Sequence, residues 1–402
     1  MIVYYINLLL ILALAYPLCI YKPCKIKSAV YLLLTFGWMW FIATFRYGIG
    51  WDYLDYIYIF EQVRGLNTLD SLLSASYEPG FVFLTRAMTF FIHDHTVMYG
   101  VYQILILLPV MWFIYRYCKN AWLPTWLYAT LTFFYITMNF TRQALACSVS
   151  LLGYKFLRER KPVPYMLIVL LAASFHVTAL IMIPIYFLCN IRMTRRLAIF
   201  YGASVIIAYA TFEHIVDIIT RVIFIGYADS IHRTISLPFR YLFVPIMILA
   251  TCLTLLRMWE KRDKDAVMLT NMMLFSSVIW LFGTIYMIIE RLSMYPYILL
   301  LAALPAALEA IRPTDEDYAG LEALKAQKQP TVQQKKKKKT DTRGDIEFRI
   351  AEMARALKDR EVYYWSAVAA VIIITLIYHT FGVNMEFHLV FPYQSVLEWP
   401  WL

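Results

Sequence analysis

Long apolar stretches separated by short polar ones recur along almost the whole chain. About 20 apolar residues cross the bilayer core as a helix, so stretches of this kind predict membrane spans. Ten such spans are predicted, at residues 2–20, 28–45, 97–115, 121–139, 142–157, 197–212, 238–256, 266–289, 292–308 and 362–381. A further stretch, 163–188, is long enough for one tilted helix or for two short helices that fold back near His176.

Composition supports the same conclusion. Apolar residues make up 61% of the 402 residues, charged residues make up 16%, and the mean hydropathy is +0.60. Soluble proteins are roughly 45–50% apolar and about 25% charged, so this chain is expected to be an integral membrane protein. A soluble nucleic-acid-binding protein is excluded despite the net charge of +10. The six cysteines form no CxxC pair and no metal-ligand spacing with histidine, so neither a disulfide framework nor a zinc site is implied. No cofactor is expected.

Charge predicts the topology. Basic clusters lie near residues 22–27, 116–119, 158–161, 192–196, 257–264 and 312–360. If all six face the cytoplasm, the segment 163–188 must cross twice, which gives about twelve transmembrane helices with both termini outside. The segment 81–92, with Arg86 at its centre, is then expected to form a short re-entrant or interfacial outer helix.

Three parts of the chain follow from this topology. Residues 1–311 form a transmembrane catalytic bundle with outer loops at 46–96 and 213–237, the second of which has the amphipathic character of a lid or surface helix. Residues 312–361 form a cytoplasmic Lys-rich linker that contains five consecutive lysines, and residues 362–402 form the last transmembrane helix and an outward-facing tail. The fold class is therefore all-α and polytopic.

The outer face predicted in this way carries arginine and no lysine. Its cations are Arg46, Arg64, Arg86, Arg142, Arg221, Arg233, Arg240 and Arg291. A guanidinium binds phosphate oxygens in a bidentate manner, whereas lysine acts as a point charge. The outer face is therefore expected to bind a phosphorylated or otherwise anionic ligand.

Two motifs place arginine beside features that suit an anionic ligand. The loop RYGIGWDYLDY begins with Arg46 and combines Gly50 with the carboxylate of Asp52, although an interfacial belt of aromatic residues would also explain it. In TRQALA, Arg142 stands at the start of a span, where helix N–H groups favour an anion, and Gln143 follows it. The alternative for Arg142 is a snorkelling side chain without a ligand.

Two further motifs lie at the same predicted face. In SFHVTAL, His176 interrupts a long apolar stretch and could act as a general base, or it could be a histidine satisfied by a backbone carbonyl. In ERLSMY, Arg291 could bind phosphate or form an ion pair with Glu290.

Taken together, RYGIGWDYLDY, YEPGF, TRQALA, the basic RERK and SFHVTAL resemble the EpsG family of bacterial membrane polymerases of exopolysaccharide and O-antigen, similar in role to the Wzy group. The resemblance runs from about residue 46 to residue 190 and extends weakly to RLSMY at 291–295. Trp51 stands where threonine would be expected, and the Lys-rich insertion before the last span is atypical.

The resemblance implies a GT-C-like glycosyltransferase in the bacterial cytoplasmic membrane, with its active site facing outward. Donor and acceptor would both be undecaprenyl-diphosphate-linked oligosaccharides, and the growing glycan would be transferred onto the non-reducing end of an incoming repeat unit. No metal is implied; the bilayer and a chain-length regulator are expected partners, and nucleic acid is not. His176 or Asp52 would be the base and Arg142 would hold diphosphate, whereas the substrate-binding residues would be Arg46, Tyr47, Gly50, Tyr53, Glu78, Gln143, Arg291 and Tyr295. The alternative is a flippase for the same lipid-linked oligosaccharide, and an O-acyltransferase is a third possibility.

Overall fold

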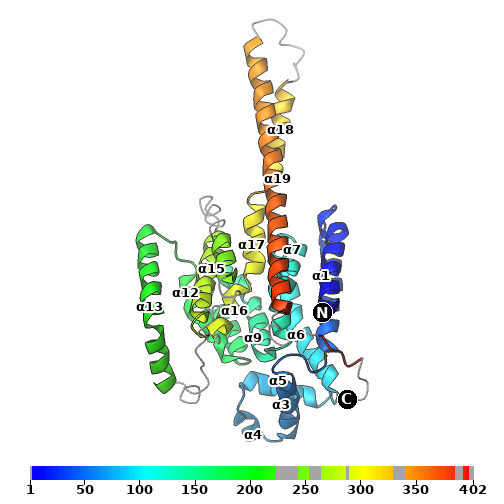
Figure 1. Cartoon of the computed structure of the whole chain (residues 1–402), viewed down its shortest axis with the longest axis vertical. Coiled ribbons are helices and arrows are strands. Elements are labelled where there is room, and N and C mark those ends of the chain that lie inside the picture. The colour runs from blue at the N-terminus through cyan, green and yellow to red at the C-terminus, as the bar shows by residue number, and fades with distance from the viewer. Residues whose placement is uncertain are drawn as a thin grey trace. The chain divides into compact units, whose positions relative to one another are not determined.

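The computed structural model describes residues 2–222, 243–252, 264–286, 289–328, 340–384 and 393–397. Within these ranges the regular structure is helical and contains no strand (Figure 1). Six helices there are long and apolar enough to cross a membrane: Ile2–Ile20, Lys25–Thr44, His95–Tyr117, Arg195–His214, Asp265–Gly283 and Asp345–Asn384. The bent pair Glu290–Tyr297 and Leu300–Glu309 would be a seventh. The all-α polytopic membrane fold is thus confirmed, whereas the count of twelve crossings stays a prediction.

Two compact units make up the chain, residues 1–305 with 375–402 and residues 306–374. The described helices of the first unit are α1 (Ile2–Ala15, continued by the π-helix η1, Tyr16–Ile20), α2 (Lys25–Thr44), α3 (Tyr53–Gly65), α4 (Leu69–Leu73), α5 (Pro79–Thr89), α6 (His95–Tyr117), α7 (Trp122–Thr130), α8 (Phe133–Thr137), α9 (Thr141–Leu152), α10 (Tyr154–Arg158), α11 (Pro162–Ala173), the 3-10 helix η2 (Val177–Ile181), α12 (Met182–Leu188), α13 (Arg195–Val222), the short apolar helix Phe243–Cys252, α15 (Lys264–Gly283) and α16 (Glu290–Tyr297). α17 (Leu300–Glu309) and α19 (Thr340–Asn384) belong to both units, and α18 (Asp315–Lys328) belongs to the second.

Helices α2 and α6 run antiparallel, so each end of the pair combines the start of one helix with the end of the other. At one end, Trp40 of α2 donates a hydrogen bond to the carbonyl of Gly100 in α6 at 2.9 Å. At the other end, Lys25 of α2 and Arg116 of α6 line one cavity. The segment from Arg46 to Glu78 follows α2 and precedes α6, so it lies at the end away from Lys25 and Arg116. Arg142 and His176 reach the same end through their contacts with Glu78.

The segment predicted as one span at 121–139 is broken in the structure. Thr132 has a left-handed backbone with φ of 67°, which separates α7 from α8. The break is almost fully enclosed by protein, which suits a membrane chain because irregular backbone cannot face lipid. The segment 142–157 is likewise divided, into α9 and α10 at Gly153, and the segment 292–308 is bent by 49° between α16 and α17.

The segment 163–188 forms the pair of short helices that was one of the two predicted alternatives. Helix α11 ends at Ala173, and the chain turns before η2 and α12 begin. With 12 residues, α11 is about 18 Å long, well below the ~30 Å of a bilayer core. His176 lies in the turn between the two halves.

Helices α3, α4 and α5 form a separate layer at one end of the first unit (Figure 1). Their core contains the rings of Tyr53, Tyr56 and Phe81 packed against Tyr99 and Tyr102 of α6. Helix α5 covers most of the segment 81–92 that was expected to be re-entrant or interfacial, and it packs on α3 rather than standing as a span of its own.

In the second unit, the start of the predicted linker 312–361 is held to α19 by arginine. Arg360 donates hydrogen bonds to the carbonyls of Ile311 and Arg312 and pairs with Asp317 at 2.9 Å. Asp317 also accepts from the backbone and hydroxyl of Thr314. The consecutive lysines 335–339 and the part of the predicted lid from 223 to 237 lie outside the described residues.

Candidate functional site

Three residues from distant parts of the sequence meet at the carboxylate of Glu78. Its Oε2 accepts a hydrogen bond from Arg142 Nη1 at 2.6 Å, and its Oε1 contacts His176 Nδ1 at 2.8 Å. Oε1 also accepts from the backbone N–H of Val177 at 3.3 Å. The side chains are only 16–27% exposed, so solvent weakly screens these contacts. We call Glu78, Arg142 and His176 the Glu78 cluster.

The start of helix α5 brings Glu78 to His176. Glu78 is the N-cap of α5, and Pro79 occupies the first helical position, where a missing N–H costs nothing. Gly80 lies against the turn after α11: an added Cβ would stand 2.2 Å from Ser174 Oγ. Phe81 then donates its backbone N–H to the carbonyl of Ser174 at 3.2 Å. The absence of a side chain at Gly80 therefore allows the close approach that positions Glu78.

Arg142 is placed by the first turn of helix α9. Its backbone N–H donates to the hydroxyl of Tyr56 at 3.1 Å, and its guanidinium lies over the ring of Tyr77 at 5.1 Å. Its Nε is buried and has no hydrogen-bond partner among the residues that the structure describes. Arg142 thus binds Glu78 through one Nη, while 27% of its side-chain surface stays exposed.

The electrostatics of the cluster keep Glu78 ionised. Burial raises the pKa of Glu78, but the hydrogen bond from His176 and the charge of Arg142 outweigh this effect and lower it to about 2. An ionised Glu78 can accept the Nδ1–H of His176. In the neutral ring with this tautomer, the lone pair lies on Nε2. The arrangement can therefore orient an imidazole as a proton acceptor.

A second group of predicted residues joins α9 to α16. Gln143 donates its side-chain N–H to the backbone carbonyl of Arg291, and Tyr295 shares a hydrogen bond with Thr178 at 2.9 Å. The guanidinium of Arg291 lies 4.1 Å from the ring centre of Phe140 and forms no hydrogen bond to any described residue. Because Thr178 lies two residues after His176, these contacts place α16 beside the Glu78 cluster.

Asp52 is close enough to Arg291 and Arg142 for both positive charges to act on its carboxylate. Gly50 has φ of 97°, and an added Cβ would stand 2.7 Å from the carbonyl of Met138, so only glycine fits there. This close approach lets the backbone N–H of Asp52 donate to the side chain of Asn139 at 3.3 Å. Burial raises the pKa of Asp52, and the positive charge of Arg291 opposes the increase.

Arg46 does not join this group. It has no exposed surface and lies over the ring of Tyr99 at 4.2 Å. One Nη donates to the carbonyl of Ala43, whereas its Nε and the other Nη have no hydrogen-bond partner in the described part of the chain. The residues beside it are held by the C-terminal segment, because Tyr47 donates its N–H to Gln394 and Val396 donates to Phe45. A ligand at the surface does not reach Arg46 in this structure.

Tyr53 is also buried and stacks on Tyr99, with ring centres 4.9 Å apart, whereas Tyr47 is half-buried at its edge. The structure adds Tyr56, Asn139 and Phe140, which sequence reasoning did not single out. Asn139 and Phe140 directly precede TRQALA, so their adjacency to that motif was the available signal. Among the described residues, no group of three or more His, Cys, Asp and Glu could hold a metal ion.

Comparison with known proteins identifies one family. The model of the EpsG family matches residues 29–316, which contain all of the residues described in this subsection except the C-terminal segment. No curated protein and no solved structure matches the chain.

Proposed function

The chain belongs to the EpsG family, and on that premise we propose that it is a polysaccharide polymerase of the glycosyltransferase type. The proposed donor is a growing glycan on undecaprenyl diphosphate, and the acceptor is the non-reducing end of a lipid-linked repeat unit. The observation that carries the proposal is the Glu78 cluster, which joins a fixed imidazole to a guanidinium at one end of the bundle.

His176 is the proposed base. Glu78 occupies its Nδ1, so Nε2 is the atom that can accept the proton of the acceptor hydroxyl. As it loses its proton, the acceptor oxygen attacks the anomeric carbon of the donor, and the bond from that carbon to the diphosphate oxygen breaks. The new glycosidic bond has the opposite anomeric configuration, and undecaprenyl diphosphate leaves with the electron pair.

Arg142 and Arg291 are the proposed partners of the leaving diphosphate. Negative charge grows on that group in the transition state, so positioned donors lower the barrier without a metal ion. The side chain of Arg142 is 27% exposed at the N-terminal end of α9, and Arg291 forms no hydrogen bond to a described residue. Gln143 holds the backbone at Arg291 and so fixes the distance between the two cations.

Asp52 is proposed to bind a sugar hydroxyl rather than to act as the base. Burial raises the pKa of Asp52, and the positive charges of Arg291 and Arg142 only partly oppose this increase, so the assignment rests on orientation. Among the described residues, no side chain forms a hydrogen bond to its carboxylate as Glu78 does to His176. A polymerase in this arrangement works at the outer membrane face, because the cluster lies at the end of α2 and α6 away from Lys25 and Arg116.

The test is elongation by the purified chain in proteoliposomes supplied with a lipid-linked repeat unit. A ladder of longer glycans is expected, and His176→Ala is expected to abolish it. Arg64→Gln is the matched control, because Arg64 is an outer arginine that pairs with Glu61 outside the Glu78 cluster. Transfer of the unit across the bilayer without elongation would instead establish the flippase, and the polymerase would be rejected.

A further inference from the structure

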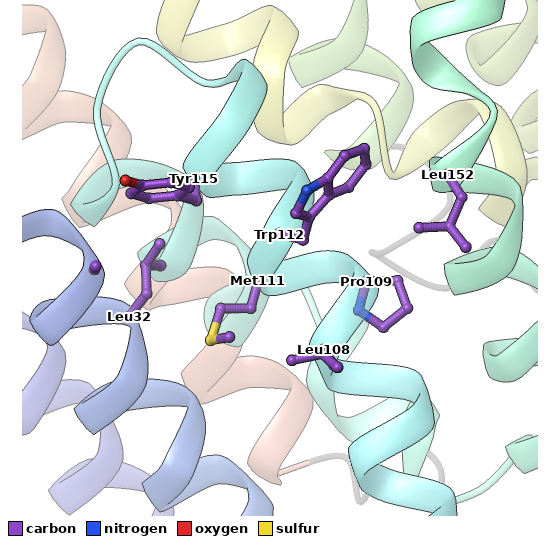
Figure 2. Close-up of a pocket in the computed structure, with 8 residues that line it drawn as sticks. Leu32, Leu108, Pro109, Met111, Trp112, Tyr115 and Leu152 are labelled. Carbon is purple, nitrogen blue, oxygen red and sulfur yellow. The ribbon is translucent and has the colours of Figure 1, made fainter. Parts of the chain in front are cut away.

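An apolar groove lies on the first unit, far from the Glu78 cluster along helices α2 and α6. Figure 2 shows the residues that line it, with Leu32 on α2, Leu108 and Trp112 on α6, and Leu152 at the end of α9. The groove encloses about 550 Å³. Leu108 and Trp112 remain 55% and 38% exposed, so the groove is open sideways to whatever surrounds the helices.

A basic cavity of about 350 Å³ adjoins this groove. Lys25, Arg116 and Lys119 line it, and Tyr115 lines both the cavity and the groove. All three cations are exposed, and none is paired with a carboxylate among the described residues. Three cations around one hollow create a positive potential that favours the binding of an anion there.

The start of α2 also favours the binding of an anion at this cavity. Lys25 begins the helix, whose first turn contains no acidic residue, so a positive side chain stands at the positive end of the helix dipole. Lys27, by contrast, donates to the carbonyls of Tyr21 and Lys22 and is satisfied by the backbone. Of Lys25 and Lys27, Lys25 is therefore the one whose ammonium group can bind an external anion.

We propose that the basic cavity and the groove together bind one anionic phospholipid. Its phosphate lies among Lys25, Arg116 and Lys119, and one acyl chain lies along Leu32, Leu108 and Trp112. The apolar groove alone would confer no preference, because bilayer tails are as apolar as leucine side chains. The cations supply the selectivity, as basic hollows between transmembrane helices do for anionic head groups.

The open side of the groove favours a two-chain lipid over a single-chain one. One acyl chain occupies the groove, and the second stays among the neighbouring lipids beside Leu108. The site is independent of the proposed polymerase reaction, because it lies at the ends of α2 and α6 opposite the Glu78 cluster. A loss of lipid binding and a loss of elongation are therefore separable results.

The experiment measures retention of phosphatidylglycerol and phosphatidylcholine by the purified full chain, using native mass spectrometry and thermal unfolding with added lipid. Phosphatidylglycerol is expected to bind and to raise Tm, whereas phosphatidylcholine is not. The triple variant Lys25→Gln/Arg116→Gln/Lys119→Gln is expected to bind about 100-fold more weakly, at roughly fivefold for each cation. Added salt is expected to weaken binding to the wild-type chain.

Two further variants complete the test. Arg192→Gln/Arg195→Gln/Arg196→Gln removes the same charge from exposed positions that do not line the cavity, and it is expected to retain the lipid. Ala29→Trp fills the groove without changing charge and is expected to weaken binding at least tenfold. Equal retention of the two lipids, an equal loss in the control triple variant, an inert Ala29→Trp, or stoichiometric displacement of phosphatidylglycerol by an isoprenoid phosphate would each overturn the proposal.

Discussion

Replacing Glu78 with glutamine removes the charge at the centre of the Glu78 cluster while keeping its size. The carboxylate uses both oxygens, one for Arg142 and the other for His176 and the backbone N–H of Val177. Glutamine has only one acceptor oxygen. If that oxygen stays with His176, the amide N–H₂ faces the guanidinium of Arg142, so two donors oppose each other.

The size of the effect follows from the pKa of Glu78. A pKa that falls from 4.5 to about 2 corresponds to about 3 kcal/mol of favourable interaction with the ionised form. This stabilisation is fully present above pH 4.5, where the unfolded chain is ionised too, and it is lost as the pH falls through about 2. Glu78→Gln is therefore expected to unfold about 5 °C lower than wild type at pH 7, and the difference is expected to shrink below pH 4.5.

Activity is expected to fall further than stability. Without a carboxylate at Nδ1, His176 is a less well oriented base, and positioned bases contribute about 10²–10⁴-fold to rate. The expected loss of kcat in the proteoliposome assay is at least about 100-fold at a temperature where both proteins are folded. Glu78→Asp, which keeps the charge, is expected to recover part of the stability.

A Glu78→Gln chain that elongates glycans within twofold of wild type and unfolds at the same temperature would refute this reasoning. A chain that is destabilised but retains full kcat would restrict Glu78 to a structural role and would remove the argument for His176 as the base.

Three other predictions concern the site and the topology. Arg142→Lys is expected to lower elongation at least about tenfold, since a point charge cannot bond Glu78 and diphosphate together as the guanidinium does; wild-type kinetics would contradict this role. Gly80→Ala is expected to cost about 1–3 kcal/mol and to reduce elongation, because the new Cβ meets Ser174, whereas Gly65→Ala has no atom within 4 Å and serves as the control in the same thermal and activity assays. A cysteine at Arg158 is expected to resist an impermeant reagent in whole cells, and external labelling there would overturn the predicted orientation.

The sequence alone determined the class of this protein. Helical spans depend on runs of about 20 neighbouring residues, and a membrane leaves few alternatives to a helix for such runs. The same local logic singled out Arg142 at a helix start and His176 in an apolar interruption. It also predicted α1, α2 and α6 closely, because nothing distant in the chain is needed to define an apolar helix.

The tertiary structure decided which polar residues act together. Glu78 is 64 residues from Arg142 and 98 from His176, and their contact depends on how α5 docks against the turn after α11. Arg46 carried the same sequence signal as Arg142, yet packing against Tyr99 removes it from the surface. The physical reason is that spans are selected by local transfer into lipid, whereas ion pairs and burial depend on contacts between segments that are remote in sequence.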